Sequence, residues 1–230
     1  MLAAGFTKSS VGKKLLMAAT GLMLFGFVVG HLLGNLQIFL GAKVLNEYAV
    51  HLLELGPLLW LMRGGLLTAL ILHIGLAVNL ALENRKARPT GYSFRASVQT
   101  TYAARTMMVS GVIILAYVVY HLLHFTFRVT NPEISSLHDA AGHHDVYAMV
   151  VLSFKDPVIS GVYILAQLLL ASHLSHGFGS MFQSLGWICE GNEYCMKKVS
   201  LAIGALIGLG YISIPAAVLL NMLTVPGGAG

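Results

Sequence analysis

Four histidines lie inside long apolar stretches of this chain, where ionisable side chains are rare. His31, His73, His121 and His173 each belong to a different stretch, and the one containing His121 has no charged residue from 106 to 127. An ionisable group within a membrane-spanning segment is by default a functional hypothesis. A neutral imidazole can ligate a metal, carry a proton or bond to a neighbouring helix. The elements that hold these four rings therefore decide which chemistry applies.

The composition indicates an integral membrane protein. The chain is 57% hydrophobic and 10% charged, with a mean hydropathy of +0.77, whereas soluble domains are about 25% charged. At 230 residues it has room for five crossings with short connections. We expect one all-α domain over residues 1–230, so any soluble chemistry must come from partner proteins.

Five apolar runs predict five transmembrane helices, since about 20 apolar residues cross a bilayer. The expected spans are 15–40, 58–82, 105–127, 157–182 and 199–223. The first run is too long for the apolar part of a cleaved signal peptide, which has about 7 to 15 residues. The first four spans carry the histidines and should form one bundle, and the fifth has none and should serve packing.

The connections differ in character. Residues 41–57 predict a short interfacial helix, whereas 128–156 and 190–198 read as a solvated loop and a polar hairpin. Cys189 and Cys195 are interpreted as ordinary thiols, with a disulfide or metal role as the alternative. No Cys-x-x-Cys-His sequence is present, which excludes covalent c-type haem attachment.

The basic residues predict the orientation. One side would carry ten and the other four, and an excess of lysine and arginine marks the cytoplasmic side. The ten are Lys8, Lys13, Lys14, Arg85, Lys86, Arg88, Arg95, Arg105, Lys197 and Lys198; the four are Lys43, Arg63, Arg128 and Lys155. The N-terminus is therefore expected in the cytoplasm and the C-terminus outside.

Depth groups the four histidines into two pairs. Counted from the inner end of each span, His31 lies 17 residues beyond Lys14 and His121 lies 16 beyond Arg105. His73 lies 10 residues before Glu83, and His173 lies 10 before Gln183. At 1.5 Å per residue, the two levels differ by about 10 Å. Two facing imidazoles at each level are what two six-coordinate haem irons require. For any single histidine, a hydrogen bond to a neighbouring helix is the alternative.

Four further side chains could contact the same cofactors. His124 and His176 follow His121 and His173 by three residues, on nearly the same helix face, so spacing alone leaves open which of each two is the ligand. The second histidines could contact haem propionates, serve a quinone pocket or lie near the interface. Arg63 and Arg105, at helix ends, could grip haem propionates or reach for the interface.

Four motifs together resemble a known family. They are Gly30-His31-Leu32-Leu33-Gly34-Asn35, Leu72-His73-Ile74-Gly75, Tyr120-His121-Leu122-Leu123-His124-Phe125 and Ser172-His173-Leu174-Ser175-His176-Gly177. The chain resembles the di-haem cytochrome b anchor of succinate dehydrogenases and fumarate reductases, in the form with one five-helix polypeptide. The resemblance implies that His121 and His173 are ligands. It pairs the first span with the third and the second with the fourth, as depth does.

The resemblance also implies partners and a location. A flavoprotein subunit would interconvert succinate and fumarate, and an iron-sulfur subunit would dock on the cytoplasmic face near the basic residues of 85–95. The chain would lie in a bacterial cytoplasmic membrane and bind a quinone, usually menaquinone, near the outer haem. Glu54 is the first candidate for accepting quinol protons, followed by His51, with Glu47 as the rival. No nucleic acid partner is expected.

Two other functions compete. A di-haem cytochrome of another quinone-linked complex, such as a hydrogenase or formate dehydrogenase, has the same chemistry. Complexes of the bc type are disfavoured, because two of their helices each carry two haem ligands and no helix here does. A histidine-lined metal transporter or proton channel belongs to another class. Transporters often contain internal repeats and one central site, whereas no repeat is evident here and the histidines lie at two heights.

Overall fold

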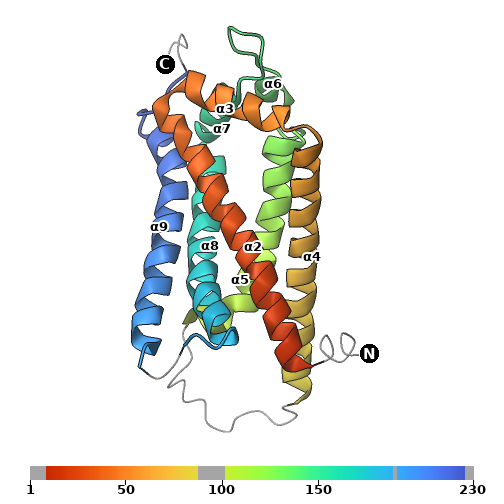
Figure 1. Cartoon of the computed structure of the whole chain (residues 1–230). Coiled ribbons are helices and arrows are strands. Elements are labelled where there is room, and N and C mark those ends of the chain that lie inside the picture. Colours follow the sequence, from red (N-terminus) through yellow and green to blue (C-terminus); the bar gives the residue numbers. More distant parts are fainter. Residues whose placement is uncertain (1–8, 88–101, 189–190, 226–230) are drawn as a thin grey trace.

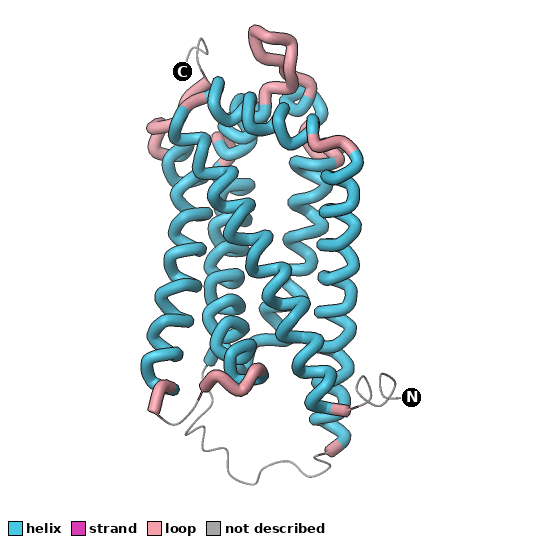
Figure 2. Tube along the Cα trace, viewed as in Figure 1, coloured by secondary structure: helices cyan, strands magenta, loops and turns pink. Residues whose placement is uncertain are grey.

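The computed structural model describes residues 9–87, 102–188 and 191–225, and this part of the chain is helical without a β-strand (Figures 1 and 2). Five of its helices are long and apolar enough to cross a membrane. They are α2 (Ser10–Leu36), continued by the 3-10 turn η1 (Gln37–Leu40); α4 (Pro57–Lys86); α5 (Tyr102–His121), continued by the π-helical turn η2 (Leu122–Thr126); α8 (Pro157–Ser184); and α9 (Glu193–Leu219). The prediction of an all-α protein with five apolar spans is confirmed.

Local sequence explains where these helices begin. The Ser9 side chain caps α2 by accepting a hydrogen bond from the Gly12 N–H at 3.0 Å. Asp156 caps α8 in the same way, accepting from the Val158 N–H at 2.7 Å, and Pro157 follows as the first helical residue. Proline suits that position because its missing N–H would have no partner inside the helix.

The bundle is packed unevenly. α8 lies in the middle and packs against α9, α5 and α2, whereas α4 packs extensively only against α2 (Figure 1). Ala69 is the single fully buried residue of α4. Direct packing between helices therefore does not close the bundle between α4 and α8.

Three short helices cover the end of the bundle opposite the N-terminus: α3 (Ala42–Glu54), α6 (Pro132–Ser135) and α7 (Val146–Phe154) (Figure 1). The first confirms the short helix expected within residues 41–57. The prediction of a solvated loop over 128–156 is wrong for α7, which is buried, with Val151 and Phe154 0% and 5% exposed. Nine residues are too few to cross a bilayer, and this apolar segment is instead buried against α3, α8 and α9.

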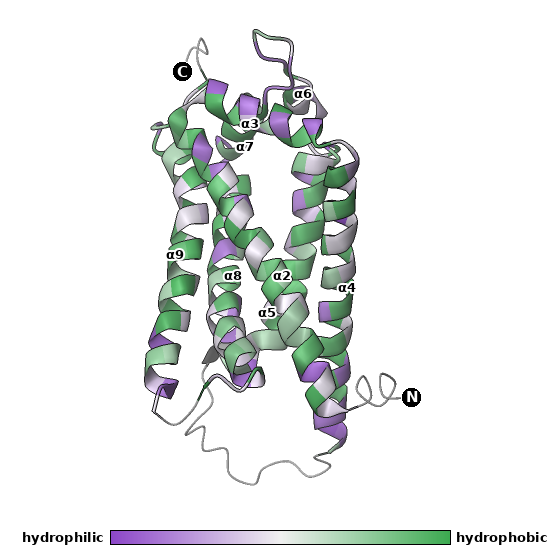
Figure 3. Ribbon diagram, viewed as in Figure 1, coloured by the Kyte–Doolittle hydropathy of each residue, from purple (hydrophilic) through white to green (hydrophobic). Residues whose placement is uncertain are grey.

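The end of the bundle where α2 starts differs from the prediction in one detail. α9 begins at Glu193, so most of the predicted polar hairpin 190–198 is helical, with Lys197 Nζ 2.7 Å from Glu193 Oε1 one turn away. Cys195 is exposed with a free thiol. Cys189, Lys8 and residues 88–95 of the basic segment lie outside the described residues. Polar residues gather at both ends of the bundle, as expected of a multi-pass membrane protein (Figure 3).

Candidate functional site

The outer pair of histidines meets across the bundle. His31 on α2 and His121 at the end of α5 have ring centroids 5.9 Å apart and ring planes 83° apart. Two imidazoles bound to opposite sides of one metal ion, each through a bond of about 2 Å, have ring centres about 6 Å apart. The spacing of the two rings therefore suits one metal ion between them.

The inner pair shares one hydrogen-bonding geometry. His73 Nδ1 lies 3.2 Å from Thr20 Oγ1 of α2, and His173 Nδ1 lies 3.2 Å from Ser110 Oγ of α5. The same contact thus occurs on both sides of the bundle, each time between a histidine and a hydroxyl of the neighbouring helix.

These contacts determine which ring nitrogen carries hydrogen. Thr20 donates its one hydroxyl hydrogen to the backbone, with Leu16 O at 2.9 Å, and Ser110 donates to Met107 O at 3.1 Å. While the hydroxyl hydrogens point to these carbonyls, each hydroxyl oxygen accepts a hydrogen bond from histidine Nδ1–H. A neutral imidazole protonated at Nδ1 has its free lone pair on Nε2, which is a metal-ligating atom.

A glycine follows each of these hydroxyl residues and lies against the ring. A Cβ on Gly21 would be 3.4 Å from His73 Cε1, and one on Gly111 would be 3.6 Å from His173 Cε1. A methyl group would just fit, whereas a larger side chain would displace the ring. Sequence reasoning missed both hydroxyl–glycine pairs. The sequence feature that could have revealed them is their similar depth, since Thr20 lies six residues beyond Lys14 and Ser110 lies five beyond Arg105.

His124 turns into the protein interior. It is 1% exposed, with Nδ1 2.9 Å from the Tyr163 hydroxyl and Nε2 3.2 Å from Ser153 Oγ. Both ring nitrogens are therefore engaged within the packing of α5, α7 and α8. In this arrangement neither is free for a haem propionate or a quinone.

The other suggested propionate contacts lie at the margins of the bundle. His176 Nε2 is 3.1 Å from Ser180 Oγ, one turn further along its own helix. Arg63 is exposed near the start of α4, with its guanidinium carbon 5.0 Å above the Trp60 ring centroid. Arg105 is exposed near the start of α5. The contact between Arg63 and Trp60 is typical of an interfacial anchor.

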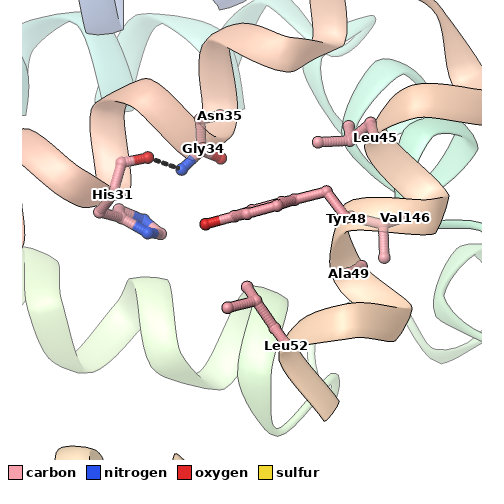
Figure 4. A pocket seen from close by; sticks show the side chains of 8 residues that line it. All are labelled: His31, Gly34, Asn35, Leu45, Tyr48, Ala49, Leu52 and Val146. Carbon is pink, nitrogen blue, oxygen red and sulfur yellow. Dashed lines mark hydrogen bonds between the residues drawn. The ribbon is translucent and has the colours of Figure 1, made fainter. Parts of the chain in front are cut away.

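A cavity of about 160 Å³ opens beside His31 (Figure 4). Its lining residues are His31, Gly34, Asn35, Leu45, Tyr48, Ala49, Leu52 and Val146. The Tyr48 hydroxyl points toward the His31 ring (Figure 4). A Cβ on Gly34 would lie 2.6 Å from this hydroxyl, so only glycine leaves room for Tyr48.

The predicted quinone residues occupy the other face of α3. The cavity is lined by positions 45, 48, 49 and 52, one face of the helix. His51 and Glu54 instead bond to each other, with Nδ1 and Oε2 3.0 Å apart and side chains 73% and 66% exposed. Glu47 is also outside the cavity, paired with Lys43 at 3.8 Å. The structure therefore separates these ionisable side chains from the cavity beside His31.

His144, in the cap between α6 and α7, is half-buried and bonds to the backbone. Its Nδ1 lies 3.3 Å from Leu137 O, and burial of the ring, followed by the positive charge of Arg128, lowers its pKa. The ring is therefore uncharged near neutral pH. Over the described residues, no three His, Cys, Asp or Glu side chains converge on one metal position.

Comparisons with protein-family models, with curated proteins and with solved structures give no match for this chain.

Proposed function

We propose that this chain is the di-haem cytochrome b anchor of a succinate:quinone oxidoreductase, in a bacterial cytoplasmic membrane with its N-terminus inside. His31 and His121 would be the axial ligands of an outer haem b, and His73 and His173 those of an inner one. The observation that carries the proposal is the pair of hydroxyl contacts that leave Nε2 of His73 and His173 free for a metal.

The residues present fit such cofactors in two further respects. The 5.9 Å spacing of His31 and His121 suits two ligands on one iron. The side of α4 that faces α8 is not closed by helix packing, which suits a flat cofactor between them. A bound haem b would accept and release single electrons.

The remaining parts of the proposed complex follow from the four motifs. An iron-sulfur subunit would dock on the cytoplasmic face, and a flavoprotein subunit would carry the succinate and fumarate chemistry. The membrane-side reactant would be a quinone, with menaquinone as the usual species of the resembling family. We propose that its head group reaches the cavity beside His31, where the Tyr48 hydroxyl could orient it. Glu54 and His51, on the aqueous face of α3, would then pass its protons outward.

The test is the visible spectrum of the complex purified in detergent. We expect a Soret band and two haems per chain in the wild type. His31→Ala should remove the outer haem alone and His73→Ala the inner haem alone, each about half of the haem, because each variant lacks one axial ligand. Redox titration would identify which haem is lost. The matched control is His51→Ala, an exposed histidine that should keep both haems.

A colourless wild-type complex would overturn the proposal and favour a transporter or channel. Covalent or tightly bound flavin in the same preparation would assign the haem protein to the succinate or fumarate complex. Absence of flavin, together with hydrogenase or formate dehydrogenase activity, would assign the haem protein to another quinone-linked complex.

A further inference from the structure

A chain of four polar side chains runs through the interior next to the outer pair. His121 Nδ1 is 3.5 Å from the Tyr163 hydroxyl, which is 2.9 Å from His124 Nδ1. His124 Nε2 in turn lies 3.2 Å from Ser153 Oγ. Tyr163, His124 and Ser153 are 4%, 1% and 1% exposed, so water does not compete for these contacts. The first contact is the loosest, because 3.5 Å is long for a hydrogen bond.

The hydrogen bonds among these four side chains all run in one direction if His121 binds a metal through Nε2. Its Nδ1–H then donates to the Tyr163 oxygen, and the one hydroxyl hydrogen of Tyr163 goes to His124 Nδ1. His124 consequently carries its hydrogen on Nε2 and donates it to Ser153 Oγ. Hydrogen bonds aligned in this way polarise one another.

The π-helical turn η2 brings both histidines to Tyr163. The Phe127 N–H donates to Leu122 O at 2.7 Å, a five-residue step that inserts one extra residue after His121. The rings of His121 and His124 lie 6.0 and 5.8 Å from the Tyr163 ring. Single π-turns inside α-helices are frequent at functional sites.

We propose that Tyr163 and His124 are positioning residues that set the redox potential of the outer haem through Nδ1–H of His121. The inference rests on the proposed haem ligation. An acceptor on Nδ1–H makes the imidazole a stronger electron donor, which stabilises ferric iron. Polarisation through His124 and Ser153 strengthens that acceptor, so removal of the Tyr163 hydroxyl should favour the ferrous state.

The experiment is a redox titration of both haems in the purified complex. With Tyr163→Phe we expect about a tenfold higher ferrous-to-ferric ratio of the outer haem at a fixed ambient potential, equal to about 59 mV for one electron. The inner haem should be unchanged. The g values of the outer ferric haem, measured by low-temperature electron paramagnetic resonance, should shift as well, because they depend on how strongly the axial imidazole donates electrons.

The matched control is Tyr211→Phe. The Tyr211 ring also lies next to the outer pair, 6.2 Å from His31, but its hydroxyl donates to Val28 O at 2.7 Å and is not part of the chain. Its loss should leave both potentials unchanged. His124→Leu should shift the outer haem in the same direction as Tyr163→Phe, and His124→Gln, which can both accept from Tyr163 and donate to Ser153, should restore the potential.

Two outcomes separate the inference from the proposed function. Two bound haems with potentials unchanged in Tyr163→Phe would overturn the inference and leave the proposed function standing. A wild-type complex without haem would overturn the proposed function itself. If Tyr163→Phe fails to hold the outer haem, the His124 variants decide, since an unshifted potential in His124→Leu would also overturn the inference.

Discussion

The position of one hydrogen atom decides what the inner histidines can do. Thr20 and Ser110 each give their hydroxyl hydrogen to their own helix, so each accepts from an imidazole. The contact both orients the ring and fixes its tautomer. Mutation of such a partner behind a ligand typically lowers metal affinity about 10- to 100-fold. The two hydroxyls are therefore part of the proposed haem site.

Thr20→Val tests this role, because valine keeps the shape of threonine but cannot accept the hydrogen bond of His73 Nδ1–H. We expect the affinity for the inner haem to fall about 10- to 100-fold, with the outer haem retained. Haem loss on dilution into excess apomyoglobin, followed in the visible spectrum, measures this. Thr68→Val is the control, since Thr68 donates to Gly64 O of its own helix on an exposed face of α4. Equal haem loss in both variants would contradict the assigned role of Thr20.

Among the five apolar spans of the described residues, α9 is the one without a histidine, and glycines bring it against α8. A Cβ on Gly204 would lie 2.5 Å from Ala171 O, and one on Gly208 would lie 2.8 Å from Ala171 Cβ. Small residues at a helix contact allow the backbones to approach closely in a membrane. The α8–α9 contact thus holds the helix that carries His173 in place.

Gly204→Ala should destabilise the bundle, because the added methyl group meets a backbone oxygen that cannot move aside. The expected loss is about 1–3 kcal/mol of unfolding free energy, the usual cost of overpacking. Loss of helical circular dichroism during SDS titration in mixed micelles measures it. Gly26→Ala provides the comparison, since a Cβ there meets nothing within 4 Å. If both alanines have the same effect, close α8–α9 packing is not what requires glycine.

For the whole molecule, five crossings place the N- and C-terminal ends of the bundle on opposite sides (Figure 1). The cap formed by α3, α6 and α7 lies at the end opposite the start of α2. From the distribution of lysine and arginine we propose that the capped end faces outside. The cavity beside His31 is then on the outer side.

Labelling with a membrane-impermeant maleimide tests this orientation. We expect the exposed thiol of Cys195, at the inner end of α9, to react in inverted vesicles and not in intact cells. Ser136→Cys, in the exposed part of the cap after α6, should add a site that reacts in intact cells. The opposite pattern would invert the topology and move the cavity to the cytoplasmic side.

The sequence by itself determined the spans and the partners of the outer histidines. Hydropathy marks an apolar helix without reference to its neighbours, and the fixed rise per residue converts sequence position into depth. Depth was therefore enough to match His31 with His121, whose rings do meet. It also matched His73 with His173, and the binding of haem by these pairs stays a prediction.

Only the tertiary structure decided how each helix is rotated and what each ring touches. Thr20 and His73 are 53 residues apart, and His124 meets Tyr163 39 residues away, so no local pattern announces either contact. The π-helical turn and the burial of α7 likewise depend on how distant segments pack. Rotation about the helix axis also turned Glu54 away from the cavity beside His31, because hydropathy fixes a helix's depth but not the direction in which its side chains point.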